Sequence, residues 1–385
     1  MKSTTMKQML RGALLLGAVL SLSLISCSLK KSTVKIGLIV PTSGEYADST
    51  GLPAINAAQM AADEVNEAGG LLVGDKRYQI ELVVMDNAGS PETSVSAAHQ
   101  LINQEGVAAI VGPMFSSNAI PVGEVAEAAH IPMISPTSTN PQTTLDKQYV
   151  FRASFVDDFQ GQAMARFAYE TLGIRRSAIL YDVASTYNQG LANTYQAAFT
   201  GLGGEVVAVE TYTTDRNEDF SQQLTAIQAQ SPEALFVPNS TNVVLLQGQQ
   251  ARDMGLGAVI LGGDSWEAER LVEYVAFENS FFSGHYCRDK SISAIRDFSD
   301  RFEALYGREP NGLMALTYDS MHLLFAAMQN QGKVTPEAIQ AGLYQIDFQG
   351  ITGKIVYDGI GDPRKSVAIW HITGGDRGCY QIIDP

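Results

Sequence analysis

Basic side chains are scarce in this sequence. The 26 Lys and Arg residues stand against 41 Asp and Glu residues, which leaves a formal net charge of −15 at pH 7. Proteins that bind nucleic acid neutralise backbone phosphates with clustered Lys and Arg, so this composition argues against a nucleic-acid partner. Hydrophobic residues make up 45% of the chain and charged residues only 17%, which is typical of a globular protein and not of a disordered one.

Sequence signatures of catalysis are also missing. The turn after the first expected strand, residues 41–45, reads Pro-Thr-Ser-Gly-Glu where a dinucleotide-binding protein has GxGxxG. Neither the phosphate-binding pattern GxxxxGK followed by Ser or Thr nor the hydrolase pattern GxSxG occurs in the chain. The five histidines are scattered without ligand spacing, and no CxxC pair suggests zinc. We therefore expect a binding protein without cofactor or metal and not an enzyme.

Long hydrophobic runs are limited to one, from Gly12 to Ile25, which follows the basic residues Lys2, Lys7 and Arg11. This run is too short to cross a bilayer, which takes about 20 apolar residues, whereas about 7–15 apolar residues after a basic leader are typical of a secretory signal. We interpret residues 1–26 as a signal peptide and expect the rest of the chain to be exported and soluble.

The end of the apolar run reads Leu24-Ile25-Ser26-Cys27, which resembles the lipobox of bacterial lipoproteins, where the cysteine is diacylated and becomes the mature N-terminus. The resemblance implies that Cys27 carries a lipid and that residues 27–33 form a polar tether, so that only the lipid contacts the membrane. The protein would then be anchored at the cell membrane, on its periplasmic or cell-surface side. An ordinary signal peptide with a chance cysteine is the alternative.

Cysteine is rare, with three residues, so lipidation of Cys27 leaves Cys287 and Cys379. In an exported, oxidising setting this pair could form a disulfide, although two free thiols fit the sequence equally well. The spacing of the two residues does not decide between these possibilities.

Apolar runs rich in β-branched residues alternate with segments of helical periodicity from Val34 onward, which is the signature of βα units wound into a parallel sheet. A first series of strands is expected at residues 34–40, 78–85, 107–111 and 131–134, and a second at 177–181, 205–212, 234–237, 258–261 and 281–286. Helices are expected at 53–65, 91–105, 292–306 and 313–329, and short strands again between 351 and 383. A chain of 385 residues is long enough for two such α/β domains.

Six turns between these elements resemble, in their order and spacing, those of one protein family. They are residues 43–47 (Ser-Gly-Glu-Tyr-Ala), 69–71 (Gly-Gly-Leu), 112–117 (Gly-Pro-Met-Phe-Ser-Ser), 135–141 (Ser-Pro-Thr-Ser-Thr-Asn-Pro), 152–161, and 262–266 (Gly-Gly-Asp-Ser-Trp). Together they are similar to the leucine/isoleucine/valine-binding family of extracytoplasmic solute-binding proteins of ABC importers. The resemblance covers essentially the whole mature chain.

This resemblance implies a type I periplasmic-binding fold, in which two Rossmann-like lobes with parallel sheets are joined by three hinge crossings and hold a ligand between them. Lobe 1 would comprise residues 34–153 and 288–350, and lobe 2 residues 154–287 and 351–385. The resemblance further implies a monomer that captures a free amino acid and delivers it to an ABC permease and its ATPase.

Hydroxyl-bearing turns follow two of the expected strands. Ser116 comes after the strand that ends at residue 111, and Thr137 and Thr139 come after the one that ends at residue 134. In an open α/β sheet, ligands bind beyond the carboxyl ends of the strands, where helix N-termini present unpaired N–H groups to anions. The resemblance assigns an α-carboxylate to these three residues and gives Thr139 a share of the ammonium. The alternative is that they only cap helices and form turns.

An amino acid also needs an anion for its ammonium group, and the resemblance gives that role to Asp264, just after the strand at 258–261. Asp157 stands at the family's other acidic position, near the first crossing. Loop aspartates are usually solvated and inert, which is the alternative for either residue. Tyr187 falls where the family has a Tyr-Gly pair whose tyrosine lines the cleft. Asn188 replaces the glycine, and asparagine tolerates positive φ, so the turn can persist.

The resemblance implies an aromatic or apolar wall around the ligand's side chain, for which Tyr46, Phe115 and Trp266 are the candidates, with Ser49 nearby. Trp266 could stack on the ligand or could be a packed hinge aromatic. Residues 238–241 occupy a turn where some family members have a ligand-facing tyrosine, so a leucine-like ligand is only the default. An amide, a urea or an aromatic acid are alternative ligands, and the ligand-binding part of a sensor is the alternative function.

Overall fold

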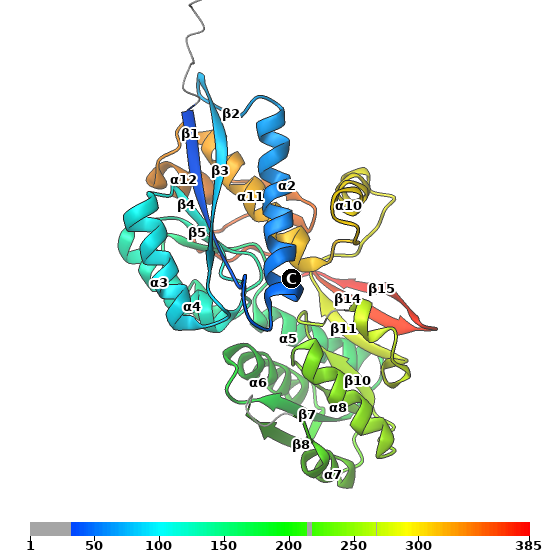
Figure 1. Cartoon of the computed structure of the whole chain (residues 1–385). Coiled ribbons are helices and arrows are strands. Elements are labelled where there is room, and N and C mark those ends of the chain that lie inside the picture. The colour runs from blue at the N-terminus through cyan, green and yellow to red at the C-terminus, as the bar shows by residue number, and fades with distance from the viewer. Residues whose placement is uncertain (1–31, 214–217, 267) are drawn as a thin grey trace, which may run out of the picture. The chain divides into compact units, whose positions relative to one another are not determined.

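Two sheets covered by helices form the body of the protein, and the computed structural model describes residues 32–213, 218–266 and 268–385 (Figure 1). The first sheet contains, in spatial order, β2 (Leu71–Val73), β3 (Lys76–Asp86), β1 (Ser32–Val40), β4 (Ala109–Val111), β5 (Met133–Ser135) and β6 (Val150–Arg152). Strands β1, β4, β5 and β6 run parallel. We call this sheet and its helices lobe 1.

The second sheet and its helices form lobe 2. Its strands are, in spatial order, β15 (Asp376–Ile383), β14 (Val367–Thr373), β11 (Ser280–Gly284), β10 (Val259–Gly262), β9 (Ala234–Phe236), β7 (Arg176–Asp182) and β8 (Glu205–Tyr212). The five strands from β7 to β11 are paired in parallel, whereas β14 runs antiparallel to both β11 and β15. Two mainly parallel α/β lobes were expected, and this architecture is confirmed.

Helices cover both sheets. Lobe 1 carries α2 (Leu52–Glu67), α3 (Pro91–Gln100), α4 (Ser116–Ala129), α10 (Ser293–Tyr306), α11 (Gly312–Gln331) and α12 (Pro336–Tyr344), and lobe 2 carries α5 (Asp157–Arg166), α6 (Thr186–Gly201), α7 (Ser221–Ala229), α8 (Thr241–Asp253) and α9 (Ala268–Leu271). Short 3-10 or π-helical turns lie at Ala47–Gly51, Leu101–Glu105, Pro141–Thr143, Phe167–Thr171 and Val275–Phe277. The helix expected over 91–105 therefore changes from α to π geometry at Leu101.

Side chains of each sheet divide between two cores, as a doubly wound sheet requires. In β1, Leu38 packs in the core shared with α2 and α11, whereas the next residue, Ile39, packs on the opposite face with α3 and α4. In β7, Leu180 likewise packs with α7 and α8, whereas the preceding residue, Ile179, packs on the opposite face with α5 and α6. Because both faces are buried, these strands appear in the sequence as continuous apolar runs.

The chain passes between the sheets three times within the described residues, after β6, after β11 and after the hairpin of β12 (Phe348–Gly350) and β13 (Gly353–Ile355). The third passage lies later than expected. Tyr357 is buried in the core of lobe 1, and the carbonyl of Gly361 accepts a hydrogen bond from the backbone of β6. Asp319 of α11 also accepts two backbone hydrogen bonds of 2.8 Å from the hairpin turn. Residues 351–361, which we expected in lobe 2, therefore pack with lobe 1.

Cys287 and Cys379 form a disulfide, with 5.4 Å between their Cα atoms. The bond ties the second passage, just after β11, to the edge strand β15. The expected signal peptide (1–26), Cys27 and the tether up to residue 31 lie outside the described residues. Among the helices that the structure does describe, none is both long enough and apolar enough to span a membrane.

Candidate ligand-binding site

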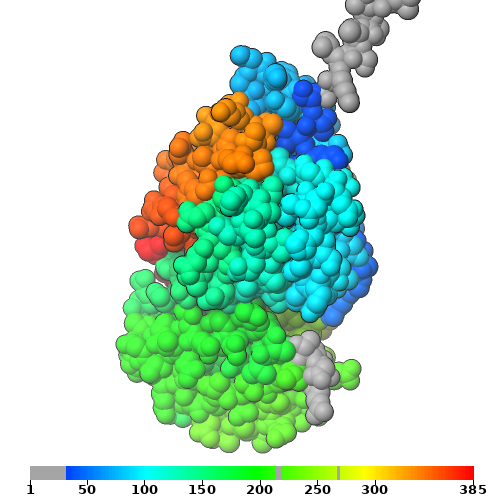
Figure 2. Space-filling model, turned by 90° about the vertical axis from the view of Figure 1, so that its left-hand side faces the viewer, coloured from blue at the N-terminus to red at the C-terminus, as the bar shows by residue number. Residues whose placement is uncertain are grey.

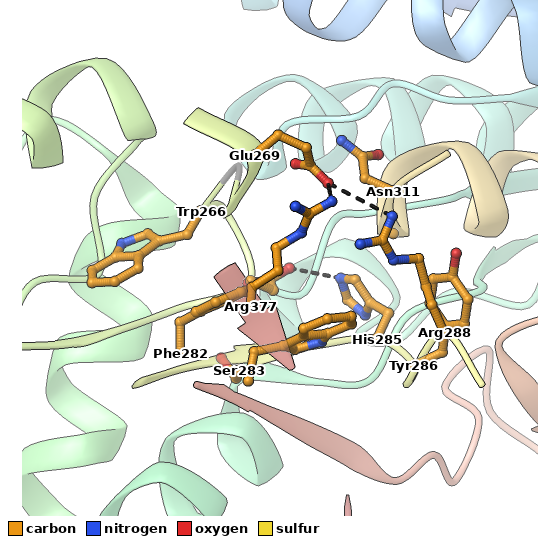
Figure 3. A pocket seen from close by; sticks show the side chains of 13 residues that line it. Trp266, Glu269, Phe282, Ser283, His285, Tyr286, Arg288, Asn311 and Arg377 are labelled. Carbon is orange, nitrogen blue, oxygen red and sulfur yellow. Dashed lines mark hydrogen bonds and ion pairs between the residues drawn. The ribbon is translucent and has the colours of Figure 1, made fainter. Parts of the chain in front are cut away.

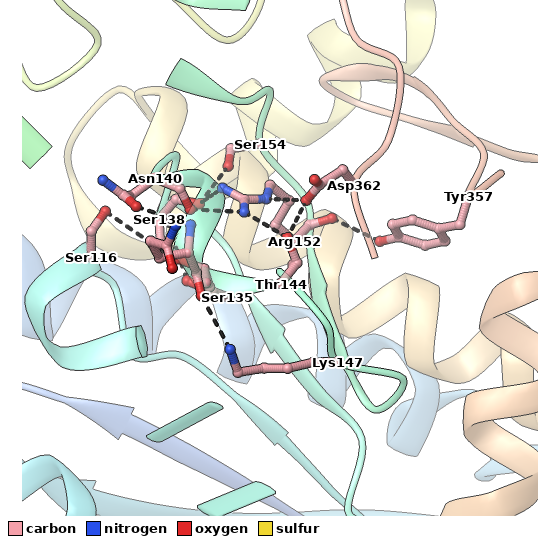
Figure 4. Close-up of polar contacts among 12 residues, drawn as sticks. Ser116, Ser135, Ser138, Asn140, Thr144, Lys147, Arg152, Ser154, Tyr357 and Asp362 are labelled. Carbon is pink, nitrogen blue, oxygen red and sulfur yellow. Dashed lines mark hydrogen bonds and ion pairs between the residues drawn. The ribbon is translucent and has the colours of Figure 1, made fainter. Parts of the chain in front are cut away.

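A buried arginine holds the loop after β5, residues 135–140, in place (Figure 4). Arg152 is 0% exposed and donates hydrogen bonds to the carbonyl oxygens of Ser138, at 2.7 Å, and Asn140, at 2.9 Å. Its Nε also donates to Asp362 at 2.6 Å, so the buried cation is paired. A guanidinium presents its donors in a fixed plane, which fixes the conformation of the loop. Arg152 was not predicted to shape the site.

The hydroxyl groups expected at the carboxylate site lie in adjacent turns. Ser116, the first residue of α4, accepts a hydrogen bond of 3.0 Å from Ser138 Oγ, which lies 2.7 Å from Thr143 Oγ1. Because Ser138 has only one hydroxyl hydrogen, it must accept from Thr143, and this relay leaves the Ser116 hydroxyl able to donate to a ligand. Thr137 differs, since its hydroxyl already donates to the carbonyl oxygen of Met114 at 2.8 Å.

Buried oxygen atoms near the start of α5 have no hydrogen-bond partner among the described residues. These atoms are both carboxylate oxygens of Asp157, Oε1 of Gln160 and Oγ1 of Thr139. The three residues are 0% exposed, and the backbone N–H of Asp157 donates to the carbonyl oxygen of Thr139 at 2.8 Å. Asp157 and Gln160 are neighbours on one face of the helix, because they lie three residues apart. Since an unpaired buried acceptor costs about 1–3 kcal/mol, the cluster indicates a site for a ligand that carries donors.

The pKa of Asp157 is raised to about 8, chiefly because burial penalises the charged form. The negative charge of Asp264 raises this pKa further. The nearby Thr139 hydroxyl lowers it, although this hydroxyl lies outside hydrogen-bond geometry. Asp157 is therefore mostly protonated at pH 7 in the ligand-free protein. A carboxyl group in this state ionises when a cation is placed against it.

Asp264, in the turn after β10, already takes part in three hydrogen bonds. Its Oδ1 accepts from the Tyr187 hydroxyl at 2.7 Å and from Gln160 Nε2 at 2.8 Å, and its Oδ2 lies 2.8 Å from His285 Nε2. Burial opposes the ionisation of Asp264, but His285, Tyr187 and Gln160 outweigh it and hold the pKa of this carboxyl below its ordinary value. Asp264 is therefore an ionised and nearly saturated carboxylate, in contrast to Asp157.

Tyr187 is the second residue of α6, and its hydroxyl points at Asp264. The neighbouring Asn188 does not need positive φ, because it lies in the first turn of the helix, where its backbone N–H donates to the N-cap side chain of Ser185 at 3.2 Å. The Asn188 side chain instead donates to Asn239 at 2.8 Å. Asparagine can therefore replace glycine here because residue 188 has helical backbone geometry, and not because asparagine tolerates the positive φ that we considered.

The aromatic candidates separate into two places. Tyr46 and Phe115 form an edge-to-face pair with 4.8 Å between ring centroids, and Ser49 lies half-buried three residues after Tyr46. Trp266 belongs instead to the core of lobe 2, where it is 5% exposed and stacks on Phe282. Its indole N–H donates to a backbone carbonyl of the same core at 3.3 Å. Trp266 is thus packed in the core of lobe 2, and it also lines a pocket beside Asp264, so its contact with a ligand stays a prediction.

Besides the bond from Asp157 to Thr139, two side-chain hydrogen bonds join the lobes beside these residues. Asn140 Nδ2 donates to the carbonyl oxygen of Thr186 at 3.3 Å, and Asn242 Nδ2 donates to Glu45 Oε1 at 3.1 Å. A Cβ atom at Gly190 of α6 would lie 2.9 Å from Asn140 Nδ2, so glycine permits this close approach. Figure 2 shows residues of lobe 1 (cyan) and lobe 2 (green) in contact on one face of the molecule, where α4 approaches α6.

A pocket of about 50 Å³ lies beside Asp264 (Figure 3). Its lining combines aromatic and charged side chains, among them Trp266, Trp370, His285, Glu269, Arg288 and Arg377. Typical ligand pockets hold about 300 Å³ or more, so this space is too small for an amino acid. Ser116, Thr137 and Thr139 do not line it. Within the described parts of the chain, no cluster of His, Cys, Asp and Glu side chains could hold a metal ion.

Known proteins resemble this chain over most of its length. Residues 33–370 match the family described as "Periplasmic binding protein". The chain is 31% identical over 358 residues to an "Amino acid binding protein" of Pseudomonas aeruginosa, with 90% of this chain and 91% of that protein covered. The structure is similar to a leucine binding protein, LivK, of Thermotoga maritima, with a TM-score of 0.83, 32% identity, and coverage of 92% of this chain and 99% of that one. A branched-chain amino acid transporter substrate binding protein, LivJ, of Streptococcus pneumoniae in complex with isoleucine also has a TM-score of 0.83, with 30% identity and coverage of 92% and 100%.

Proposed function

The chain belongs to the periplasmic binding protein family, and we propose that it captures a free amino acid between its two lobes and delivers it to an ABC permease and its ATPase. Membership of this family makes the chain a solute-binding transport component that acts outside the cytoplasm, and not an enzyme. The proposed ligand has a branched-chain or other apolar or aromatic side chain. This ligand class is supported by the similar proteins, whose names include amino acid binding, leucine binding and a complex with isoleucine.

The unpaired oxygen atoms around Asp157 carry this proposal. An ammonium group has three N–H donors and no acceptor, so it can satisfy several of these atoms at once. Asp157 offers both of its carboxylate oxygens, whereas three of the roughly four acceptor positions of Asp264 are filled. We therefore assign two of the three N–H groups to the carboxylate oxygens of Asp157 and the third to the remaining acceptor position of Asp264, with the oxygen atoms of Thr139 and Gln160 beside them.

The α-carboxylate would lie at the N-terminus of α4, where the first N–H groups have no partner within the helix. Ser116 can donate its hydroxyl hydrogen there, and the hydroxyl of Thr139 lies on the neighbouring loop. Thr137 would contribute its backbone N–H, because its hydroxyl is bound to a carbonyl oxygen. The edge-to-face pair of Tyr46 and Phe115, with Ser49 beside it, supplies an apolar wall for the ligand's side chain.

Closure of the lobes completes the site. The amino acid docks first on the Ser116 and Thr139 side, and hinge rotation then brings Tyr187 and Asp264 of lobe 2 over it. Closure excludes water from both charges of the ligand, and hydrogen bonds strengthen in the lower local dielectric. The ligand shifts the equilibrium between open and closed lobes only to the extent that it binds the closed arrangement more tightly than the open one. The permease then recognises the closed form.

We further propose that the mature protein is a monomer anchored through a lipid on Cys27, with residues 27–31 as its tether, because Ser32 and Thr33, which we expected in the tether, belong to β1. The lipobox-like residues 24–27 at the end of the apolar run support this anchor. Labelling of cells with an alkyne fatty acid should mark the wild-type protein and leave Cys27→Ser unmarked. Equal labelling of both would contradict lipidation at this residue.

A thermal-shift screen tests the ligand class. The purified, ligand-stripped protein would be melted with each of the twenty amino acids and with benzoate, urea and polyamines. A ligand present at 100 times its Kd stabilises the native state by about 2.7 kcal/mol, which raises the melting temperature measurably. We expect the shift with branched-chain or other apolar L-amino acids. A shift with benzoate or urea and with none of the amino acids would replace the amino acid by the alternative ligand class.

A further inference from the structure

A histidine at the hinge, His285, contacts Asp264, and the dashed line at His285 in Figure 3 marks this contact. His285 follows β11 directly, and its Nε2 lies 2.8 Å from Asp264 Oδ2. The side chains of His285 and Asp264 are 4% and 7% exposed, so the pair is shielded from solvent. An ionised carboxylate only accepts hydrogen bonds, and Nε2 must therefore carry the proton that it shares with Asp264.

The imidazole ring of His285 is fixed by elements outside the sheet of lobe 2. It stacks on Phe155, with 4.3 Å between ring centroids and 26° between ring planes. Phe155 lies in the first passage between the lobes, just after β6. The ring also lies against the start of α11, because a Cβ at Gly312 would be 3.3 Å from His285 Cδ2. Two residues later, Cys287 is joined to β15 by the disulfide. His285 thus reaches Asp264 from the hinge.

We propose that His285 is a positioning residue for the ligand site, which keeps Asp264 ionised and oriented so that its remaining acceptor position is available to an N–H group of the ligand. The inference rests on the proposed function and adds a residue to it. Tyr187 and Gln160 both donate to Oδ1, whereas His285 is the donor that the described residues supply to Oδ2. Loss of this donor leaves a buried oxygen unpaired, a state that protonation or rotation of the carboxyl group relieves.

The groups around Asp264 show why His285 matters most to its charge. Tyr187 of α6 and His285 after β11 bind this carboxyl, and Asp157 of α5 interacts with it electrostatically. The charged residues Glu269, Arg288 and Arg377 line the same pocket as Asp264. Burial raises the pKa of Asp264, and His285 makes the largest opposing contribution. Burial and the negative charge of Asp264 raise the pKa of Tyr187, so Tyr187 stays a neutral donor. The ionised state of Asp264 therefore depends chiefly on His285.

Two substitutions separate hydrogen bonding from packing at this position. His285→Phe keeps a ring to stack on Phe155 and loses the donor, whereas His285→Gln loses the ring and keeps an N–H donor of similar reach. We expect His285→Phe to weaken the binding of L-leucine at least about tenfold in isothermal titration calorimetry, as for the loss of a hydrogen bond to a charged group. His285→Gln should stay within about threefold of the wild type.

A matched control comes from the same sheet. His371 of β14 also stacks on a phenylalanine, Phe281, with 4.3 Å between ring centroids, but its Nε2 has no hydrogen-bond partner among the described residues. His371→Phe should leave the affinity for L-leucine unchanged. In an Asp264→Asn background, His285→Phe should cause no further loss, because the proposed effect of His285 runs through Asp264. Circular dichroism melts would establish that each variant is folded.

A second readout needs no ligand. Carboxyl-carbon NMR of the ligand-free protein should show Asp264 titrating at a higher pH in His285→Phe than in the wild type. Unchanged titration, or full L-leucine binding by His285→Phe with loss by His285→Gln, would overturn the inference and reduce His285 to a packing residue. A shifted titration in a protein that binds no amino acid would overturn the proposed function while supporting the action of His285 on Asp264.

Discussion

Asp157 should lose a proton when an amino acid binds. Its pKa of about 8 in the ligand-free protein means that protonated molecules outnumber ionised ones by about ten to one at pH 7. An ammonium group against both oxygens favours the carboxylate and lowers this pKa. Binding at pH 7 should therefore release about 0.9 proton, and release should fall to about 0.5 at pH 8.

The affinity should follow the same linkage. Because the free protein binds the extra proton below pH 8, the affinity should rise about tenfold for each pH unit between pH 5 and pH 7 and level off above pH 8. Calorimetric titration at pH 7 in phosphate, HEPES and Tris measures the proton directly. The observed enthalpy should vary linearly with the ionisation enthalpy of the buffer, with a slope equal to the number of protons released.

The neighbouring aspartate offers a matched control for this experiment. Asp158 is the next residue of α5 and is exposed. Asp157→Asn should bring the proton release close to zero, whereas Asp158→Asn should keep the wild-type slope. A wild-type enthalpy that does not vary with the buffer would refute the assignment of the ammonium to Asp157, and so would an unchanged slope in Asp157→Asn.

Three further changes have defined outcomes. Asp157→Asn should stabilise the ligand-free protein against urea by up to about 4 kcal/mol at pH 7 and by about 2 kcal/mol at pH 5. The pKa of Asp157 is higher in the folded protein than in the unfolded chain, so this carboxyl destabilises the fold increasingly as the pH rises from the unfolded pKa to the folded one. Arg152→Met should lower the free energy of unfolding by about 3–5 kcal/mol in the same assay, since it removes the charged hydrogen bonds to Ser138 and Asn140 and leaves the Asp362 carboxylate without its cation. Arg166→Met, at a side chain 52% exposed, should change it by less than about 1 kcal/mol. Gly190→Ala should weaken amino acid binding about tenfold, because its methyl group would meet a side-chain nitrogen of lobe 1 at 2.9 Å, and Gly201→Ala on the same helix, where nothing lies within 4 Å, should not. Equal effects within either pair of variants would contradict the reasoning behind it.

The sheets were predictable where strands are buried on both faces. A strand such as β1 appears as a continuous apolar run, which locates it without knowledge of its neighbours. The turns after β4 and β5 were also predictable, since the carboxyl ends of parallel strands meet at one edge, and Ser116 and Thr139 do lie in adjacent turns there. Strands β2 and β6 were not predicted, because turn glycines, Gly70 and Gly74, flank β2 and because the charged residue Arg152 ends β6.

Three polar residues of the site were not assigned roles from the sequence. Arg152, Gln160 and His285 bind partners that lie 210, 104 and 21 residues away along the chain, and only the folded chain brings these groups together. A signal existed for two of them. Arg152 interrupts an apolar run, which is typical of a buried and paired cation. His285 follows the carboxyl end of a parallel strand, so the rule that located Ser116 also applies to it.

Recognition of both charges of one ligand is the claim that most needs a direct measurement. Isothermal titration calorimetry at pH 7 can compare L-leucine with 4-methylpentanoate, which lacks the ammonium, and with 3-methylbutylamine, which lacks the carboxylate. We predict that both analogues bind at least about a hundredfold more weakly than L-leucine, because each leaves buried groups of the site unpaired. Binding of 4-methylpentanoate within about threefold of L-leucine would contradict the account.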